Sequence, residues 1–171
     1  MINEDQAKGF LQFFLGTMDN EFKTTKKVIA AVPQEKCEWR PDPKAKNGLE
    51  LASHLASSEV FFMDGIISGG FTITGEEPPV PKTVADVLSL YEKEYNDRVA
   101  KLKSISGEQL AKPIPFFGVM ELPAVMYLNL MLLHSAHHRG QLSVYLRPMG
   151  SKVPSIYGGS ADEPFEMSAQ A

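Results

Sequence analysis

Apolar residues recur at intervals of three and four along four long stretches of the chain. This spacing places them on one face of an α-helix, because 3.6 residues complete one turn. The pattern is regular in the third stretch, where its apolar positions form a single stripe. The four predicted helices cover residues 4–32, 47–70, 83–102 and 122–150.

The ends of these stretches carry helix-boundary residues. Asn47 is followed three residues later by Glu50, the spacing of a capping box, and Thr83 stands in the same relation to Asp86. Pro123 suits the first turn of a helix, where a backbone N–H is not needed. The sequence therefore predicts a first helical turn at each of these points.

The connecting segments are rich in proline and glycine. The piece IPFFGVMEL alternates around a glycine and predicts a short hairpin, whereas the tail from Ser151 shows turn residues and no helical period. We expect one all-α domain over residues 1–171, a four-helix bundle with irregular connectors and a C-terminal tail. The connectors are long enough that simple up-down-up-down topology is not required. They span residues 33–47, 69–82 and 106–121.

The composition excludes several classes of protein. Of the 171 residues, 43% are hydrophobic and 22% charged, as in ordinary globular proteins, and the net charge of −4 without a basic run argues against nucleic-acid binding. No uncharged apolar stretch is long enough to span a bilayer, and the polar, acidic start does not resemble a signal peptide. The single cysteine, Cys37, excludes an internal disulfide. We expect a cytoplasmic protein with no membrane or nucleic-acid partner.

Three of the four histidines are candidates for one metal site. His134 and His138 are four residues apart in the fourth predicted helix, and His54 lies in the second. An i,i+4 pair is offset by roughly 40° and about 6 Å along a helix, so both imidazoles point to one side. A facing helix can then supply a third ligand. His137 is turned about 60° from His134, which favours a role flanking the site or on the surface over one as a shared ligand.

A histidine on an apolar helix face is more often a hydrogen-bonded core residue than a ligand. Two on one stripe need partners, however, because burying each without one costs on the order of 1–3 kcal/mol. A metal satisfies both directly. Gln141 and Tyr145 continue the same stripe and are candidate catalytic residues that touch a bound water or substrate. Their alternative role is ordinary packing in the bundle core, and the sequence leaves both open.

Three segments together resemble the DinB/YfiT-like superfamily of metal-binding four-helix bundles. They are WRPDPKAKNGLELASHLA, HSAHHRGQL and PSIYGGSADEP. The resemblance extends over nearly the whole chain. It implies a divalent-metal site with His54, His134 and His138 as protein ligands and water completing the coordination. Members of that superfamily include thiol-dependent S-transferases that use bacillithiol, mycothiol or glutathione, and hydrolase- or isomerase-like enzymes.

The expected function is that of a metal-dependent transferase joining a low-molecular-weight thiol to a small electrophile. Three neutral imidazoles leave a divalent ion its full charge and an open position, as in catalytic sites. The alternatives are a metal-dependent hydrolase, a metal-binding stress or carrier protein without turnover, and a bundle whose histidines are only core hydrogen-bonding groups.

Zinc and nickel are the expected metals, because imidazole ligands suit both. The expected partners are a small-molecule substrate and a second copy of the chain. Phe10, Phe13 and Phe14 place aromatic side chains on two sides of the first helix, more than one core requires. This surplus favours a homodimer.

Overall fold

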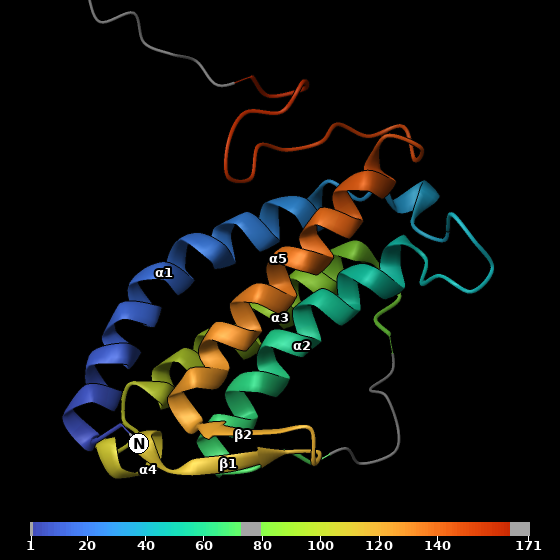
Figure 1. The fold of residues 1–171 in the computed structure, drawn as a ribbon. Helices are drawn as coiled ribbons and strands as arrows, with labels where there is room; N and C mark the ends of the chain where they lie inside the picture. Colours follow the sequence, from blue (N-terminus) through green and yellow to red (C-terminus); the bar gives the residue numbers. More distant parts are fainter. Residues whose placement is uncertain (1, 73–79, 165–171) are drawn as a thin grey trace, which may run out of the picture.

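The structure is a computed structural model that describes residues 2–72 and 80–164. Four long helices lie side by side, with a short helix and a hairpin at one end and the C-terminal tail at the other (Figure 1). The long helices are α1 (Glu4–Ala30), α2 (Gly48–Ser68), α3 (Val84–Leu102) and α5 (Tyr127–Leu146). The expected helical chain is therefore observed, with a small sheet added.

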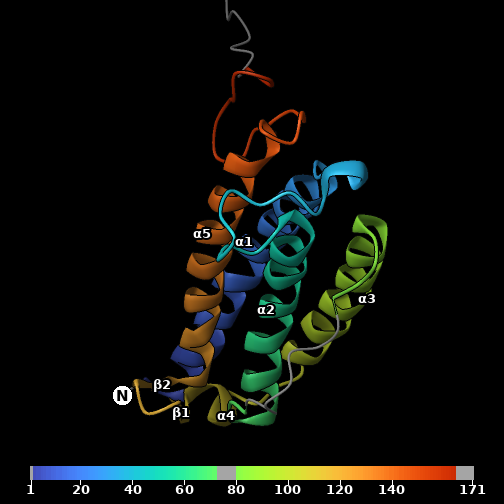
Figure 2. The ribbon, with the colours of Figure 1, turned by 90° about the vertical axis from the view of Figure 1, so that its right-hand side faces the viewer.

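The helices pack in the cyclic order α1, α5, α2, α3. Helix α2 packs against both α3 and α5, while α1 contacts α5 and α3. The chain runs in the same direction along α2 and α3 (Figure 2). The end of α2 and the start of α3 therefore lie at opposite ends of the bundle, and residues 73–79 of the segment between them lie outside the described residues. The connector predicted at residues 69–82 makes this link between α2 and α3.

Helix beginnings follow the predicted caps. The Asn47 side chain accepts a hydrogen bond from the Glu50 backbone N–H, and the Glu50 side chain accepts one from the Asn47 N–H, which completes a capping box. Asn3 and Gln6 form the same motif at the start of α1. Thr83 caps α3 through the backbone N–H of Asp86. These side chains satisfy N–H groups that have no partner within the helix.

The fourth helix was predicted to start near Leu122, and this prediction was wrong by several residues. Strand β1 (Pro113–Phe116) pairs antiparallel with β2 (Met120–Pro123), so Leu122 and Pro123 belong to a strand. A 3₁₀ turn, η2 (Ala124–Met126), follows, and α5 begins only at Tyr127. The hairpin predicted for IPFFGVMEL is confirmed. Its turn uses positive φ at Phe117 and Gly118, 50° and 74°.

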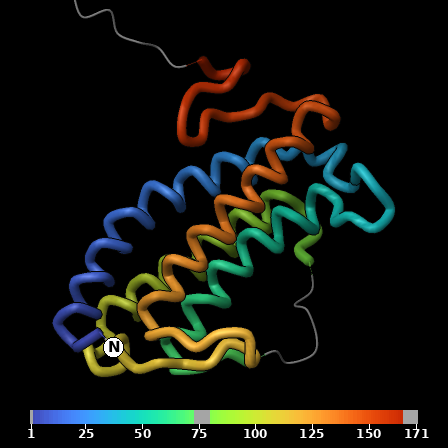
Figure 3. Tube along the Cα trace, viewed as in Figure 1, coloured from blue at the N-terminus to red at the C-terminus, as the bar shows by residue number. Residues whose placement is uncertain are grey.

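Two further helical turns were not predicted, the 3₁₀ helix η1 (Gln34–Lys36) and α4 (Gly107–Ala111). Helix α4 lies beside the start of α1 and the hairpin (Figures 1 and 3). At the opposite end, residues 151–164 run without helix or strand over the ends of α1 and α5 (Figure 3). The absence of helical period in the tail is thus confirmed for its described part. In the described ranges, no helix has the length and apolarity of a membrane span.

Candidate metal centre

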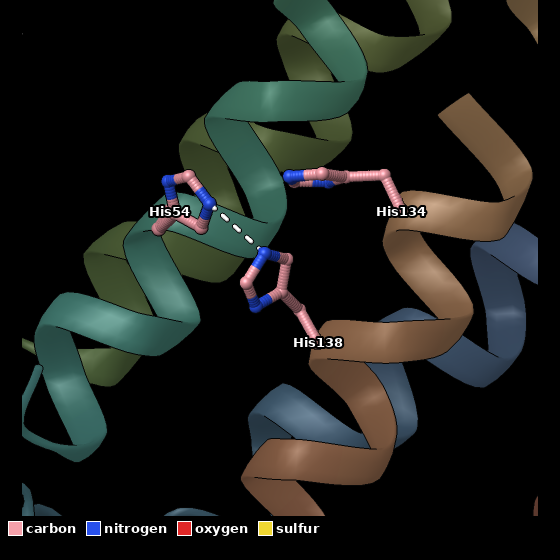
Figure 4. A group of neighbouring side chains, drawn as sticks. All are labelled: His54, His134 and His138. Carbon is pink, nitrogen blue, oxygen red and sulfur yellow. Dashed lines mark hydrogen bonds between the residues drawn. The ribbon is translucent and has the colours of Figure 1, made fainter. Parts of the chain in front are cut away.

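Helices α2 and α5 bring His54, His134 and His138 together. Each ring offers one nitrogen, and these nitrogens all lie within 4.8 Å of one another. His54 projects from α2 toward the two histidines of α5, in the space between the helices (Figure 4). The predicted convergence of three imidazoles from two separate segments is therefore observed.

The spacing fits a single ion. The Nε2 atoms of His54 and His138 are 3.2 Å apart. Two nitrogens at 2.0–2.1 Å from a tetrahedral ion are about 3.4 Å apart. His134 completes the group, with its ring centroid 4.3 Å from that of His138 and 5.3 Å from that of His54. Small movements of these side chains would bring all three onto one ion.

Burial favours the neutral form of the His134 and His138 rings. Desolvation, with smaller contributions from the neighbouring histidines, lowers the pKa of His134 from 6.5 to about 4. The pKa of His138 is also lowered, chiefly by desolvation. Neutral imidazole is the form that binds a metal, so the nitrogen lone pairs are available near neutral pH.

His134 also has an unsatisfied polar atom. Its Nδ1 is buried and lacks a hydrogen-bond partner among the residues that the structure describes. Phe62 on α2 packs against the same ring, with centroids 5.8 Å apart, so apolar surface replaces water there. A buried nitrogen without a partner is costly, and a metal ion coordinated directly by its lone pair would satisfy it. The donor set therefore fits a divalent metal.

The two predicted catalytic residues have different surroundings. Gln141 lies one turn beyond His138, and its Oε1 is 2.9 Å from His138 Nδ1. Tyr145 is buried, with its ring edge-on to Trp39 at 5.5 Å between centroids. The structure thus places Gln141 against a candidate ligand and Tyr145 against the connector that precedes α2. Their proposed contacts with water or substrate stay predictions.

Three other polar side chains near the triad, His137, Arg139 and Glu59, are not members of the ligand group. His137 is exposed, and its ring centroid lies 4.9 Å from that of His138. Arg139 is fully buried and forms an ion pair with Glu21 of α1. Glu59 of α2 hydrogen-bonds Tyr91 and Thr25 and is absent from the ligand group. Within residues 2–72 and 80–164, three histidines are the only cluster that could hold a metal.

The sequence did not reveal the cationic residues beside the triad. Arg40, Lys44 and Lys46 line a cavity that also includes His54. They come from the connector between α1 and α2, where no periodicity predicts which side chains face a site. The one available signal was their closeness in sequence to the cap of the helix that carries His54.

The comparisons with known proteins agree with this arrangement. The chain is 27% identical over 158 residues to YrdA of Bacillus subtilis (strain 168), covering 90% of this chain and 91% of that protein. The crystal structure of a DinB-like protein from Bacillus cereus superposes with a TM-score of 0.72 at 24% identity, covering 84% of this chain and 95% of that one.

A more distant likeness extends to a thiol-dependent enzyme. A mutant of the mycothiol-dependent maleylpyruvate isomerase superposes with a TM-score of 0.50 at 10% identity, over 90% of this chain and 65% of that one. This likeness concerns the fold alone. The sequence profile of the DinB family matches residues 6–167, nearly the whole length. The chain therefore belongs to the DinB family.

Proposed function

We propose that this protein is an enzyme that uses a divalent metal, zinc or nickel, to join a low-molecular-weight thiol to a small electrophile. The observation that carries the proposal is the convergence of three imidazole nitrogens, from α2 and α5, within 4.8 Å. An ion held there would act as a Lewis acid and lower the pKa of a thiol or water bound to it.

The protein's own residues support a catalytic rather than a purely structural site. The three candidate ligands leave at least one position for an outside molecule, since structural sites usually supply four protein ligands. The carboxyl group of Glu59, also on α2, accepts hydrogen bonds from Tyr91 and Thr25 and is not in the ligand group. The site also adjoins a cavity of about 360 Å³ through His54, which gives a small molecule room to approach.

Gln141 and Tyr145 have distinct parts in this proposal. Gln141 orients His138 through the 2.9 Å hydrogen bond, so it is a positioning residue. Tyr145 supports the connector through its contact with Trp39. Fold similarity to the mycothiol-dependent isomerase is consistent with thiol chemistry, although the similarity by itself concerns architecture.

The test is a thiol panel on metal-loaded protein. Protein reconstituted with zinc or nickel is incubated with bacillithiol, mycothiol or glutathione and with monochlorobimane, and conjugate formation is followed by fluorescence. We expect acceleration with at least one thiol, lost after chelation and in His138→Ala. Asn96→Ala is the control, because Asn96 is exposed on α3 and outside the triad.

The outcomes separate the alternatives. Stoichiometric metal binding without conjugation by any thiol would contradict the transferase proposal and favour a hydrolase, which the same three ligands serve, or a carrier. Unchanged metal affinity in His138→Ala would overturn the ligand assignment itself. Metal content is therefore measured on every preparation used in the panel.

A further inference from the structure

A second cavity, which we call the α2–α3 cavity, lies beside the one that includes His54. Its volume is about 350 Å³, and Ser53 and Ser57 of α2 line both cavities. Helices α2 and α3 pack against each other along it (Figure 2). A molecule that fills the α2–α3 cavity can therefore extend past the two serines to the side of the candidate metal centre that His54 forms.

The walls of the α2–α3 cavity are mainly apolar. Val60 and Phe61 of α2 and Val87 and Leu90 of α3 are among its described lining residues. Leu90 is 50% exposed although its side chain is large and apolar, and Val60 and Phe61 are half-buried. An apolar molecule in this cavity would remove that surface from water, which is a main source of affinity in small-molecule sites.

Two of the hydroxyl groups in the cavity wall have partners within the protein. The Tyr91 hydroxyl donates to the Glu59 carboxyl group at 2.6 Å, and the Ser57 hydroxyl donates to the His54 backbone oxygen at 3.3 Å. Because their protons are already used, these groups do not depend on a ligand for a hydrogen-bond acceptor. An apolar ligand can therefore cover them without leaving either donor unsatisfied.

The charged residues among the described lining of the α2–α3 cavity are both carboxylates, Asp64 and Glu94. Both form ion pairs with Arg98 of α3. Asp97, which also contacts Arg98, pairs with Lys101 at 2.7 Å. An anion in the cavity would lose hydration and meet like charge, whereas a cation would compete with Arg98 for the two carboxylates. This arrangement of charges favours an uncharged ligand.

We propose that the electrophile of the thiol reaction is an uncharged, apolar molecule whose body occupies the α2–α3 cavity, with its reactive carbon beside Ser53 and Ser57. This inference rests on the proposed function and adds the chemical class of the second substrate. In the reaction, the thiolate sulfur forms a bond to that carbon while a leaving group departs with the bonding electron pair. The proton of the thiol passes to solvent, so no oxidant or reductant is needed.

The test compares three probes that share one apolar body and differ in charge. They are 2-naphthalenemethanol, 2-naphthoate and 2-naphthylmethylammonium, each titrated into zinc-loaded protein near neutral pH and followed by ¹⁵N–¹H correlation spectra. We expect the alcohol to bind about tenfold more tightly than either ion, because an ion loses more hydration on entering an apolar cavity. The shifted signals should come from the facing parts of α2 and α3.

Variants locate the binding site. Val60→Ser and Leu90→Ser should each weaken binding of the alcohol by about fivefold, because each removes apolar contact area from the cavity wall. Val144→Ser is the matched control, because Val144 is an exposed valine of α5 outside the cavity. Glu94→Gln should tighten binding of 2-naphthoate by about threefold and leave the alcohol unchanged, since it removes a like charge. Circular dichroism verifies that each variant is folded.

Equal affinities for the three probes, tighter binding of either ion, or no binding at millimolar probe would overturn the inference. So would an affinity for the alcohol that is unchanged in both Val60→Ser and Leu90→Ser. Bimane conjugation is measured on the same samples, and the alcohol should inhibit it by competing with monochlorobimane. Conjugation that the alcohol does not inhibit would remove this inference and leave the proposed function intact. Selective binding of the alcohol without conjugation would contradict the transferase proposal and leave the cavity's preference for an uncharged ligand.

Discussion

At the scale of single residues, the Gln141 amide determines which ring nitrogen of His138 carries the proton and which has the lone pair. An oxygen acceptor at Nδ1 requires that nitrogen to carry the proton, so the lone pair is on Nε2, the atom 3.2 Å from His54 Nε2. The same partner fixes the ring's rotation. Contacts of this kind around metal-binding histidines commonly change affinity or activity 10–100-fold.

Gln141→Ala should therefore weaken zinc binding by about 10–100-fold with little change in helical content. Gln141→Glu should largely restore affinity, since it returns an oxygen acceptor to the same place. Affinity is measured by competition with a chromophoric chelator, and Gln12→Ala on the exposed side of α1 is the control. A Gln141→Ala variant with unaltered affinity would show that the hydrogen bond has no role in holding the ligand.

The triad was predictable because two of its members share a helical period and the third lies on another amphipathic segment. The surroundings of the triad were not. Phe62 and Lys46 come from different elements, and their nearness to His134 and His138 depends on how α2 and the connector pack against α5. Spacing within one helix carries no information about such contacts.

At the scale of elements, local signals predicted helix starts where a side chain caps its own backbone. Asn47 and Thr83 do so, and the structure places the caps there. The helix start predicted from Pro123 was wrong because proline occurs both in the first turn of helices and on edge strands. The Ala124 N–H donates to the Lys112 oxygen at 2.9 Å, which extends the hairpin and delays α5. That hydrogen bond joins residues twelve positions apart, so the pattern of neighbouring residues could not predict it.

Asn47→Ala tests the cap that precedes His54. Loss of the cap should lower the free energy of unfolding by about 1 kcal/mol, because the N–H of Glu50 loses its acceptor. Urea denaturation of metal-free protein measures this, with Asn96→Ala, an exposed position within α3, as the control. The prediction fails if the two variants are equally stable.

At the scale of the whole molecule, one polar network joins the four long helices and the tail. Arg139 of α5 contacts Glu21 and Thr25 of α1 and the hydroxyl of Tyr157. Thr25 also donates to Glu59 of α2 at 3.3 Å. The partners of Arg139 in α1 lie more than 100 positions away in the sequence and could not be read from any one segment.

Glu59 gives this network a pH dependence. Desolvation raises its pKa above the ordinary 4.5, despite hydrogen bonds that act in the opposite direction. The folded protein thus retains the proton to higher pH than the unfolded chain. The stabilisation is complete below about pH 4.5 and is lost as the pH rises through the folded-state pKa.

Glu59→Gln removes this titration while keeping an acceptor for Tyr91. Relative to the wild type, the variant should gain unfolding free energy as the pH rises from 4.5 to 8, because only the wild type has to release a proton. Urea denaturation of the metal-free proteins at a series of pH values measures the difference. Parallel profiles for the two proteins would show that Glu59 does not titrate with folding.

Self-association is predicted from the outer face of α1. Phe13 is 69% exposed and Phe10 39%, whereas Phe14 is buried in the core. Burying two aromatic rings against a second copy would remove apolar surface from water. Sedimentation should therefore find a dimer that Phe13→Ser converts to monomer, with Phe117→Ser in the hairpin as the control. A monomeric wild type at micromolar concentration would contradict the predicted dimer.

The division of the triad between α2 and α5 has a consequence for biosynthesis. His54 and His138 are 84 positions apart, and α5, which carries two of the three candidate ligands, is synthesised after α2. A nascent chain that has completed α2 but not α5 presents a single imidazole. An ion held by all three imidazoles would therefore enter the proposed site only after α5 has been translated.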